Sequence, residues 1–353
     1  MTDTLLRELS NTDLDWMITR GSREKFPAGH VLLSPRVPSN DLFLVIAGRL
    51  SQSFASADAV NVVPEGVLSD ELAQGEVIGF GPLFDIADST VVQTLEESLI
   101  LSLPIVKVKE KLAGDIAFAA HLYRAIAVML SRRLRCIFEH SNRLQYWGRS
   151  AKEVLSVFGE LRDSDVDWLV SFGQTETIAA DRVLLQAGRP VDAFYILLDG
   201  QMAISAPEGD FNPLYLCFSG LENSTRDQKV FARLSKGGMP GITSFLDFHP
   251  LPVTLRAVED SLVFAVPRQT LATKLQVDDS FSSRFYRVIA IQILELLQAL
   301  NAREVDASSA DASSADASSA DDEELDMDDL QQLSEGAKKF NWMLSQLESS
   351  HNV

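Results

Sequence analysis

The segment DLDWMITRGSREKFPAGHVLLSPRVPSNDLFLVIAGRL, which begins at Asp13, occurs a second time in altered form. Its counterpart, DVDWLVSFGQTETIAADRVLLQAGRPVDAFYILLDGQM, begins at Asp165 and aligns with it without a gap, 152 residues further along. Trp16 matches Trp168. Self-similarity over such a length indicates one structural unit present twice.

The similarity continues beyond these segments at a wider spacing. Pro104 matches Pro267 and Tyr123 matches Tyr286, which are 163 residues apart. The second copy therefore holds eleven extra residues. We expect them in the polar stretch 206–230, because insertions are tolerated best in surface loops.

Each copy carries the same order of local patterns. A short amphipathic helix is predicted over 11–19 and over 163–171, each starting on an Asn or Asp suited to capping. Runs rich in branched and aromatic residues, punctuated by Gly, Pro, Asn and Asp, predict strands: HVLLS, DLFLVIAGRLSQSF and STVVQTL, then RVLLQ, AFYILLDGQMAIS and VTLRAV. A long helix is predicted to close each copy, over 118–140 and 281–302, where apolar residues recur every three or four positions.

These patterns predict an α+β, mainly β protein with two β-roll (jelly-roll) domains in tandem, each followed by a long helix. The predicted domains are 1–148 and 149–303, followed by an acidic low-complexity linker over 304–325 and an amphipathic helix over 326–353.

Composition places the chain among soluble globular proteins. Its 353 residues are 46% hydrophobic and suffice for two domains of ordinary size. No stretch has the eighteen or so apolar residues of a membrane span, and the acidic start lacks the pattern of a secretory signal. Cys136 and Cys217 lie in different predicted domains and suggest no metal site. We expect a cytoplasmic protein.

The net charge of −19 argues against nucleic acid as a partner, because a phosphate backbone is bound by clustered Lys and Arg. Much of this charge is local, since 304–335 holds twelve acidic residues and no basic one. There DASSA occurs three times from Asp306, and we expect an extended, self-repelling linker.

The last segment has an apolar stripe that predicts an amphipathic helix capped by Asp328 or Asp329. It could bind a groove on a partner, fold back on the protein's own domains or pair in a homodimer. The stripe consists of Leu330, Leu333, Ala337, Phe340, Leu344 and Leu347.

Three further segments carry a resemblance to a known family. GRPVDAFYILLDGQMAIS resembles the β-hairpin signature of cyclic-nucleotide-binding domains, in which Gly200 allows the turn. The segments 75–104 and 237–267 look like that family's phosphate-binding cassette and following strand. The tandem arrangement is similar to uncharacterised cyanobacterial double-domain proteins associated with bacteriocin-type peptide export.

The resemblance implies where a ligand would bind. In nucleotide-binding members a short helix presents N–H groups to the cyclic phosphate, a Glu binds the ribose and an Arg forms a fork-like contact with the phosphate. The corresponding residues here are Phe80, Gly81, Pro82, Asp88 and Ser89 in the first copy, and Gly241, Ile242, Thr243, Ser244, Leu251, Thr254 and Arg256 in the second.

Both copies depart from the family pattern. Asp88 and Leu251 stand at the Arg position, while Pro82 and Ile242 stand at the Glu position. Losing both contacts should remove roughly 3–5 kcal/mol, or two to four decades of affinity. Binding of cyclic AMP or cyclic GMP in the usual manner is therefore disfavoured, and no cofactor is expected.

If one pocket still binds a ligand, the second copy is favoured, because Gly237, Gly238 and Gly241 let the backbone approach a ligand closely. Arg256 could swing toward an anion, or it could face solvent while the glycines serve turns. An apolar ligand, or a purely structural roll, suits Leu251 and Ile242 at least as well.

Basic residues cluster on the first closing helix at Arg132, Arg133 and Arg135. They could bind the acidic tail or an acidic partner, but a solvated helix face is the preferred interpretation.

Several functional classes lack their signatures. No helix-turn-helix follows either copy, and no phosphate-binding or dinucleotide-binding glycine motif is present. The histidines are too scattered for a metal site or a nucleophile–base pair, so no catalytic residue is predicted. They are His30, His121, His140, His249 and His351.

The leading hypothesis is a non-enzymatic regulatory or adaptor protein that acts through protein–protein contacts, with peptide-export machinery or with itself. Two alternatives stay open: a sensor of a cyclic nucleotide or another small ligand in the second domain, and a self-assembling scaffold. The sequence identifies neither the partner nor the oligomeric state.

Overall fold

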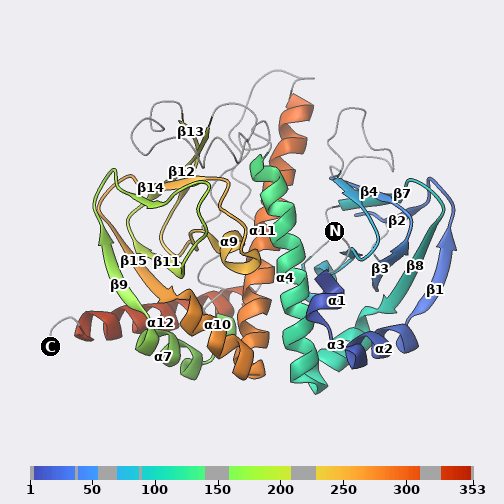
Figure 1. The fold of residues 1–353 in the computed structure, drawn as a ribbon, viewed down its shortest axis with the longest axis horizontal. Coiled ribbons are helices and arrows are strands. Elements are labelled where there is room, and N and C mark those ends of the chain that lie inside the picture. Colours follow the sequence, from blue (N-terminus) through green and yellow to red (C-terminus); the bar gives the residue numbers. More distant parts are fainter. Residues whose placement is uncertain are drawn as a thin grey trace. The chain divides into compact units, whose positions relative to one another are not determined.

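The computed structural model describes residues 4–35, 39–54, 70–86, 90–139, 159–207, 228–310 and 327–350. They belong to two compact units (Figure 1). Unit 1 comprises Met1–Met129 and Asn301–Ala315, and unit 2 comprises Leu130–Leu300 and Asp316–Val353.

Unit 1 has two four-stranded sheets whose strand pairs are all antiparallel. Their strand orders are β1-β8-β3-β6 and β2-β7-β4-β5. The strands are β1 (Ser22–Phe26), β2 (Val31–Leu33), β3 (Asp41–Ala47), β4 (Leu50–Phe54), β5 (Asp70–Leu72), β6 (Val77–Ile78), β7 (Thr90–Thr94) and β8 (Ser98–Pro104). The helices that begin in this unit are α1 (Thr4–Glu8), α2 (Asn11–Arg20), the 3-10 turn η1 (Gly81–Leu83), α3 (Ile105–Gly114) and α4 (Ile116–Glu139).

Unit 2 has a three-stranded sheet, β11-β15-β9, and a four-stranded sheet, β10-β14-β12-β13, again antiparallel. The strands are β9 (Gln174–Ile178), β10 (Val183–Leu185), β11 (Ala193–Asp199), β12 (Met202–Pro207), β13 (Gln228–Leu234), β14 (Thr254–Ala257) and β15 (Ser261–Pro267). The helices are α7 (Asp163–Phe172), α9 (Ile242–Asp247), α10 (Arg268–Val277), α11 (Asp279–Ala310) and α12 (Met327–Ser350). Of α11, the residues up to Leu300 belong to unit 2, and so do the last ten residues of α4.

The elements of unit 2 follow those of unit 1 at the two spacings found in the sequence. Strands β9, β10 and β11 begin 152 residues after β1, β2 and β3, while β15, α10 and α11 begin 163 residues after β8, α3 and α4. The change falls between β12 and α9, as expected from the stretch 206–230, of which residues 208–227 lie outside the described part. The sequence patterns missed the strands β1, β5, β6, β9 and β13. Of these, β1 and β9 are short and carry mostly polar, exposed side chains.

The core of each roll lies between its two sheets. Strand β3 buries Leu42, Phe43 and Val45, and β11 buries six consecutive residues from Ala193 to Leu198. Each fully buried aliphatic or aromatic side chain contributes about 1.5–3 kcal/mol to folding. In unit 1 one core cluster consists of Leu32, Leu33, Phe43, Val45, Leu50, Leu72, Ile78, Val92 and Ile100.

The start of each closing helix is stabilised in the same way in both units. In unit 1, Asp115 accepts a hydrogen bond from the backbone N–H of Phe118, while Lys111 pairs with Asp115 and lies 5.4–5.9 Å from the ring centres of Phe118 and Trp16. Unit 2 repeats this arrangement with Asp278, Lys274, Phe281 and Trp168. Cation–π and capping contacts of this kind join α2 to the start of α4 and α7 to the start of α11.

The capping residues of the first helices differ from the prediction. The cap of α2 is Ser10 rather than Asn11, and the carboxylate of Asp13 accepts the N–H of Ser10 at 2.9 Å. In α7, Asp165 does the same for Arg162 at 2.8 Å. An acid three residues into a helix can satisfy the cap N–H, a pattern the prediction overlooked.

The C-terminal part differs from the prediction in one respect. Residues 304–310, predicted as linker, continue helix α11, which fits the high helix propensity of the alanines there. Linker residues 311–325 lie outside the described residues.

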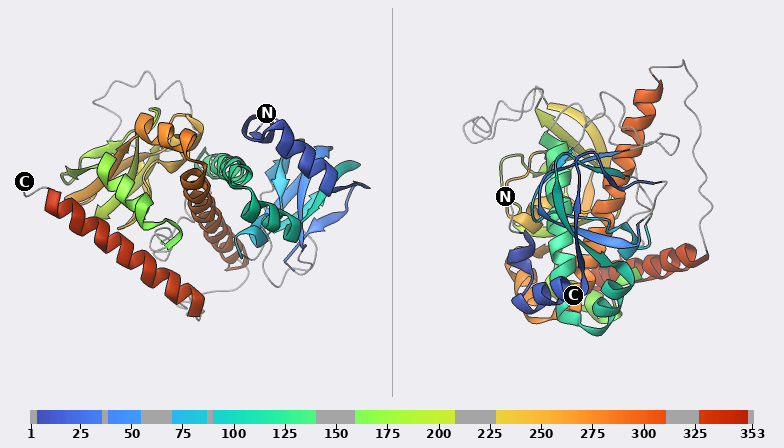
Figure 2. Two further views of the ribbon diagram at one scale, coloured as in Figure 1. Left: turned by 90° about the horizontal axis from the view of Figure 1, so that it is seen from below. Right: turned by 90° about the vertical axis from the view of Figure 1, so that its right-hand side faces the viewer.

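The predicted last helix is present as α12, and it packs on α7 of unit 2 (Figure 2, left). Phe340 and Leu347 of the predicted stripe are buried together with Met343, whereas Ala337 and Leu344 are half-buried. Lys339 adds hydrogen bonds to the carbonyl oxygens of Gly159 and Leu161.

Candidate functional site

The cassette of unit 2 turns into helix α9 at Gly241. This residue has φ = 74°, in the left-handed region that favours glycine. A Cβ atom here would lie 2.6 Å from Cδ1 of Leu185 and 2.9 Å from Cγ2 of Val191. Both the backbone conformation and the close approach therefore require glycine, in agreement with its predicted role in a turn.

Two of the predicted ligand residues are used in bonds that hold the cassette together. The hydroxyl of Ser244 is fully buried, donates to the carbonyl oxygen of His249 at 2.5 Å and accepts the N–H of Val191 at 3.3 Å. The hydroxyl of Thr254 accepts the N–H of Ala187 at 3.2 Å. These side chains fix loops to one another, so their hydrogen-bonding groups serve the fold.

The end of α9 is capped by Arg268, which the sequence did not single out. Its guanidinium donates to the carbonyl oxygens of Val191 and Ser244 at 2.7 and 2.9 Å and also to that of Phe245. The ring of Phe248 lies 3.7 Å from the guanidinium carbon. Burial lowers the pKa of Arg268, and the carboxylate of Asp247 opposes this effect. Cationic groups are favourable beside helix carbonyl ends.

A second guanidinium binds the same end of the cassette from helix α4. Arg135 forms a fork-like pair with Asp247, with Nη2–Oδ1 and Nε–Oδ2 distances of 2.6 and 3.2 Å, and donates to the carbonyl oxygen of Pro250 at 2.6 Å. The side chains of Arg135 and Asp247 are only 11% and 2% exposed. The interpretation of Arg135 as part of a solvated helix face was therefore wrong, because its acidic partner lies 112 residues away in sequence.

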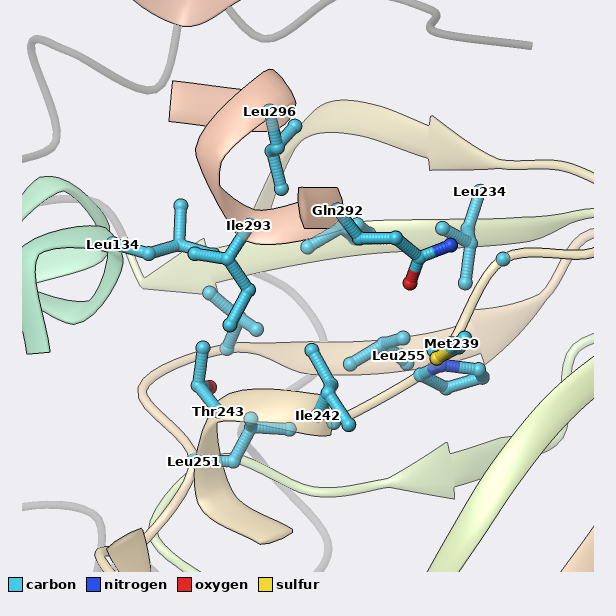
Figure 3. Close-up of a pocket in the computed structure, with 15 residues that line it drawn as sticks. Leu134, Leu234, Met239, Ile242, Thr243, Leu251, Leu255, Gln292, Ile293 and Leu296 are labelled. Atoms are coloured by element: carbon cyan, nitrogen blue, oxygen red, sulfur yellow. The ribbon is translucent and has the colours of Figure 1, made fainter. Parts of the chain in front are cut away.

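Beside Arg135, α4 also contributes to an apolar cavity of about 90 Å³ in unit 2 (Figure 3). Its walls come from the cassette, the inner faces of β12, β13 and β14, helix α11 and the C-terminal part of α4. Figure 3 shows Leu134 of α4 next to Ile293 of α11 at one side. The lining residues are Leu134, Ile204, Leu234, Gly238, Met239, Pro240, Gly241, Ile242, Thr243, Leu251, Val253, Leu255, Gln292, Ile293 and Leu296.

The residues at the Arg and Glu positions of the family pattern, Leu251 and Ile242, both line this cavity. Leu251 is 2% exposed, and its backbone pairs with that of Arg189 and Gly188. The lining contains no charged side chain, and its polar side chains are those of Thr243 and Gln292. An ionised phosphate would lose its hydration here without gaining an ionic partner from the wall.

Arg256, considered above as a phosphate-binding residue, lies elsewhere. Its guanidinium donates to the carbonyl oxygen of Asp181, and the residue does not line the cavity. It pairs on β14 with Val183 and Ala203. Neighbouring side chains on a strand point to opposite faces, so Leu255 points into the cavity and Arg256 away from it.

The corresponding segment of unit 1 is filled by apolar side chains. Phe80 precedes the 3-10 turn η1, in which Gly81 is buried and Pro82 half-buried. The rings of Phe84 and Tyr123 are 5.7 Å apart. The predicted residues Asp88 and Ser89 lie outside the described residues.

The structure thus brings together Gly241, Ile242, Thr243 and Leu251, and it separates Arg256 from them. Sequence reasoning missed Leu134, Gln292, Ile293 and Leu296, because helix periodicity marks an apolar face without identifying what it covers. It also missed the pairing of Arg135 with Asp247. In the sequence this pair is visible only as an Asp within the cassette segment and an Arg on the first closing helix, and neither residue indicates the other as its partner.

Within the described part of the chain, no group of three or more His, Cys, Asp or Glu side chains could hold a metal ion. No described helix is long and apolar enough to span a membrane.

One family model matches part of unit 2. The family model "Cyclic nucleotide-binding domain" matches residues 175–278, which cover the sheets and cassette of unit 2. Among curated proteins, uncharacterized NTE family proteins of Mycobacterium tuberculosis and Mycobacterium bovis are 22% identical over 155 residues. The match covers 44% of this chain, which spans only 23% of the length of these relatives.

Solved structures include similar chains. The N-terminal domain of a transcriptional regulator from Streptomyces coelicolor A3(2) is 24% identical, with a TM-score of 0.30, over 38% of this chain and 90% of that one. The regulatory domain of Toxoplasma gondii PKA with cAMP is 14% identical, with a TM-score of 0.27, over 76% and 87%. The regulatory subunit of a cAMP-independent protein kinase A from Trypanosoma brucei is 12% identical, with a TM-score of 0.28, over 79% and 93%.

Proposed function

We propose that this chain is a non-enzymatic regulatory protein of the cytoplasm, built from two cyclic-nucleotide-binding-type rolls in tandem, which works without a cyclic nucleotide. The family match of residues 175–278 supports the assignment of the second roll. The equal order of strands and helices in unit 1 supports the assignment of the first.

The observation that carries the proposal is the position of Leu251. This side chain stands where nucleotide-binding members need a guanidinium, and it is buried in a cavity whose walls bear no charge. Two guanidinium groups that contact the cassette, those of Arg135 and Arg268, are held by Asp247 and by backbone carbonyl groups. Redirecting either one to a phosphate would leave a buried acceptor without its partner.

The binding free energy of the missing contacts supports the same conclusion. A fork-like ionic contact and a ribose hydrogen bond are together worth about 3–5 kcal/mol, which corresponds to two to four decades in the dissociation constant. A nucleotide site with a dissociation constant of about 1 μM that lost both contacts would have one of about 0.1–10 mM. Such a site could not respond to a nucleotide at micromolar concentration.

A regulator without this ligand must transmit its effect through contacts with other proteins. The resemblance of the tandem sequence to double-domain proteins associated with bacteriocin-type peptide export suggests export machinery as the partner class. Charge supports a protein partner over nucleic acid, because the chain carries 50 acidic and 31 basic residues.

Isothermal titration calorimetry of the full chain tests the proposal. Cyclic AMP, cyclic GMP and cyclic dinucleotides, each added to about 1 mM, should give no dissociation constant tighter than about 0.1 mM, the strong end of the expected range. A dissociation constant in the micromolar range for any of them would overturn the proposal. Circular dichroism before and after the titration checks that the protein stays folded.

A further inference from the structure

The cavity of unit 2 is more than an altered nucleotide pocket, because its chemistry selects a different kind of ligand. Its volume of about 90 Å³ exceeds the roughly 10–15 Å³ that a single water molecule needs. Apolar cavities stay dry and accept small apolar molecules. Here the walls are aliphatic over the strands, the cassette and both helices, with hydroxyl and amide groups at Thr243 and Gln292.

We propose that this cavity binds a small, uncharged, mainly apolar molecule with about one hydrogen-bonding group, and that helix α4 responds to its binding. The proposal rests on the proposed function in one respect, namely that the cassette no longer holds an anion. A charged ligand is excluded by the cost of burying an ion without a partner.

The response of α4 follows from two adjacent residues. Leu134 forms part of the cavity wall, and Arg135 holds Asp247 and Pro250 at the end of the cassette. One turn earlier, the hydroxyl of Ser131 donates to the carbonyl oxygen of Thr243, another wall residue, at 3.2 Å. A ligand that contacts Leu134 and Thr243 therefore favours the state in which this part of α4 is bound to the cassette.

The ligand class can be tested with a matched pair of probes, 1-hexanol and hexanoate, which share a six-carbon chain and differ in charge at pH 7. Calorimetry on the full chain should give a dissociation constant for 1-hexanol on the order of 0.1–1 mM, as expected for burying a chain of this length. Hexanoate should bind at least about tenfold more weakly, because its carboxylate finds no cation in the walls.

Substitutions locate the site. Ile242 and Leu296 line the cavity and are half-buried, so Ile242→Phe and Leu296→Phe can fill it with limited strain. Each should weaken 1-hexanol binding at least about tenfold, the loss that corresponds to roughly 1.4 kcal/mol. Ile291→Phe is the matched control, since Ile291 is half-buried on the same helix as Leu296 and does not line the cavity. Unchanged affinity in both filling variants would overturn the assigned site.

Hydrogen exchange tests the coupling. Saturating 1-hexanol should slow amide exchange in residues 130–139 of α4 at least about threefold, while α7 residues 163–172, which do not line the cavity, stay unchanged. Binding without protection of α4 would overturn the coupling, and equal affinity for hexanoate would overturn the ligand class. Absence of hexanol binding together with absence of nucleotide binding would refute this inference alone, whereas micromolar cyclic AMP binding would refute the proposed function.

Discussion

At the scale of single residues, the cassette of unit 2 shows how one position changes the chemistry of a site. Leu251 occupies its place through two backbone hydrogen bonds with Gly188 and Arg189 that do not depend on its side chain. The fold therefore tolerates a leucine at the position where the family pattern has an Arg. Gly241 is the opposite case, because its φ of 74° and its contact with Leu185 leave no space for a side chain.

The carboxylate of Asp13 gives a prediction at this scale. Burial by itself would raise the pKa of Asp13, but hydrogen bonds from the ring of His121, at 2.9 Å, and from Ser10 outweigh burial and lower it. A lowered pKa in the folded state means that the ionised carboxylate stabilises the protein at neutral pH. This stability is lost as the pH falls from about 4 through the folded pKa.

Asp13→Asn should therefore lower the free energy of unfolding by about 0.5–2 kcal/mol at pH 7, and the difference from wild type should shrink below about pH 4. Urea unfolding at several pH values measures this. Asp15→Asn, on the same helix with an exposed side chain, is the control and should stay within about 0.5 kcal/mol of wild type. A difference that does not vary with pH would contradict the role given to the carboxylate.

At the scale of secondary-structure elements, the short helix α9 depends on its surroundings. Six residues are too few for an isolated helix to be stable in water. The helix is held by Gly241 at its start, by Ser244 within it and by Arg268 and Arg135 at its end. Tertiary contacts thus supply what local propensity cannot.

Helix α12 is the second case at this scale. Its apolar face is buried on unit 2, where Phe340 and Met343 are 2% and 0% exposed and Lys236 lies 5.6 Å from the ring centre of Phe340. The sequence was compatible with three binding places for this helix: a groove on a partner, the same helix in a homodimer, or the protein's own domains. In the structure the helix lies on the protein's own domain.

Phe340→Ala should lower the free energy of unfolding of unit 2 by about 3–5 kcal/mol, because it leaves a cavity under α12. Asn341→Ala, one residue further along with an exposed side chain, should change it by no more than about 0.5 kcal/mol. Urea unfolding followed by hydrogen exchange in α7 compares the two. If both variants have the same free energy of unfolding, α12 contributes little to the stability of unit 2.

At the scale of the whole molecule, helix α4 links the two copies of the repeat along the chain. It begins as the closing helix of the first copy, and its residues from Leu130 onward belong to unit 2. There Arg135 completes the cassette of the second copy through Asp247. Unit 2 as a folded body is therefore not the second repeat alone, but the second repeat with a segment of the first.

This arrangement predicts the consequence of removing the pair. Arg135→Ala removes the fork-like ionic partner of the buried carboxylate of Asp247 and should lower the free energy of unfolding of unit 2 by about 3–5 kcal/mol. The double variant Arg135→Met with Asp247→Asn should lose less free energy of unfolding than the two single variants lose in sum. The difference should exceed about 1 kcal/mol. Urea unfolding read by hydrogen exchange in α9 gives these energies.

The exposed pair of Lys109 and Asp85 serves as the control. Its N–O distance of 2.7 Å is close to that of the buried pair, but its side chains are 42% and 76% exposed. Lys109→Ala should therefore cost no more than about 1 kcal/mol. Equal effects of Arg135→Ala and Lys109→Ala would show that burial does not strengthen the Arg135 contact.

The amino-acid sequence by itself determined the repeat, the positions of most strands and the long helices, and the loss of Arg and Glu from the cassette. These features are local or periodic, so spacing and residue type reveal them. The patterns did not indicate β1 and β9, whose side chains are mostly polar and exposed, or β5, β6 and β13.

Only the tertiary structure decided which groups meet across long distances in sequence. It placed Arg135 on Asp247, 112 residues away, turned Arg256 away from the cavity and laid α12 on α7. Such choices depend on which surfaces a folded chain brings into contact, and burial then determines whether a charge must find a partner. The sequence contains the charges and the apolar stripes, but the packing of unit 2 selects their partners.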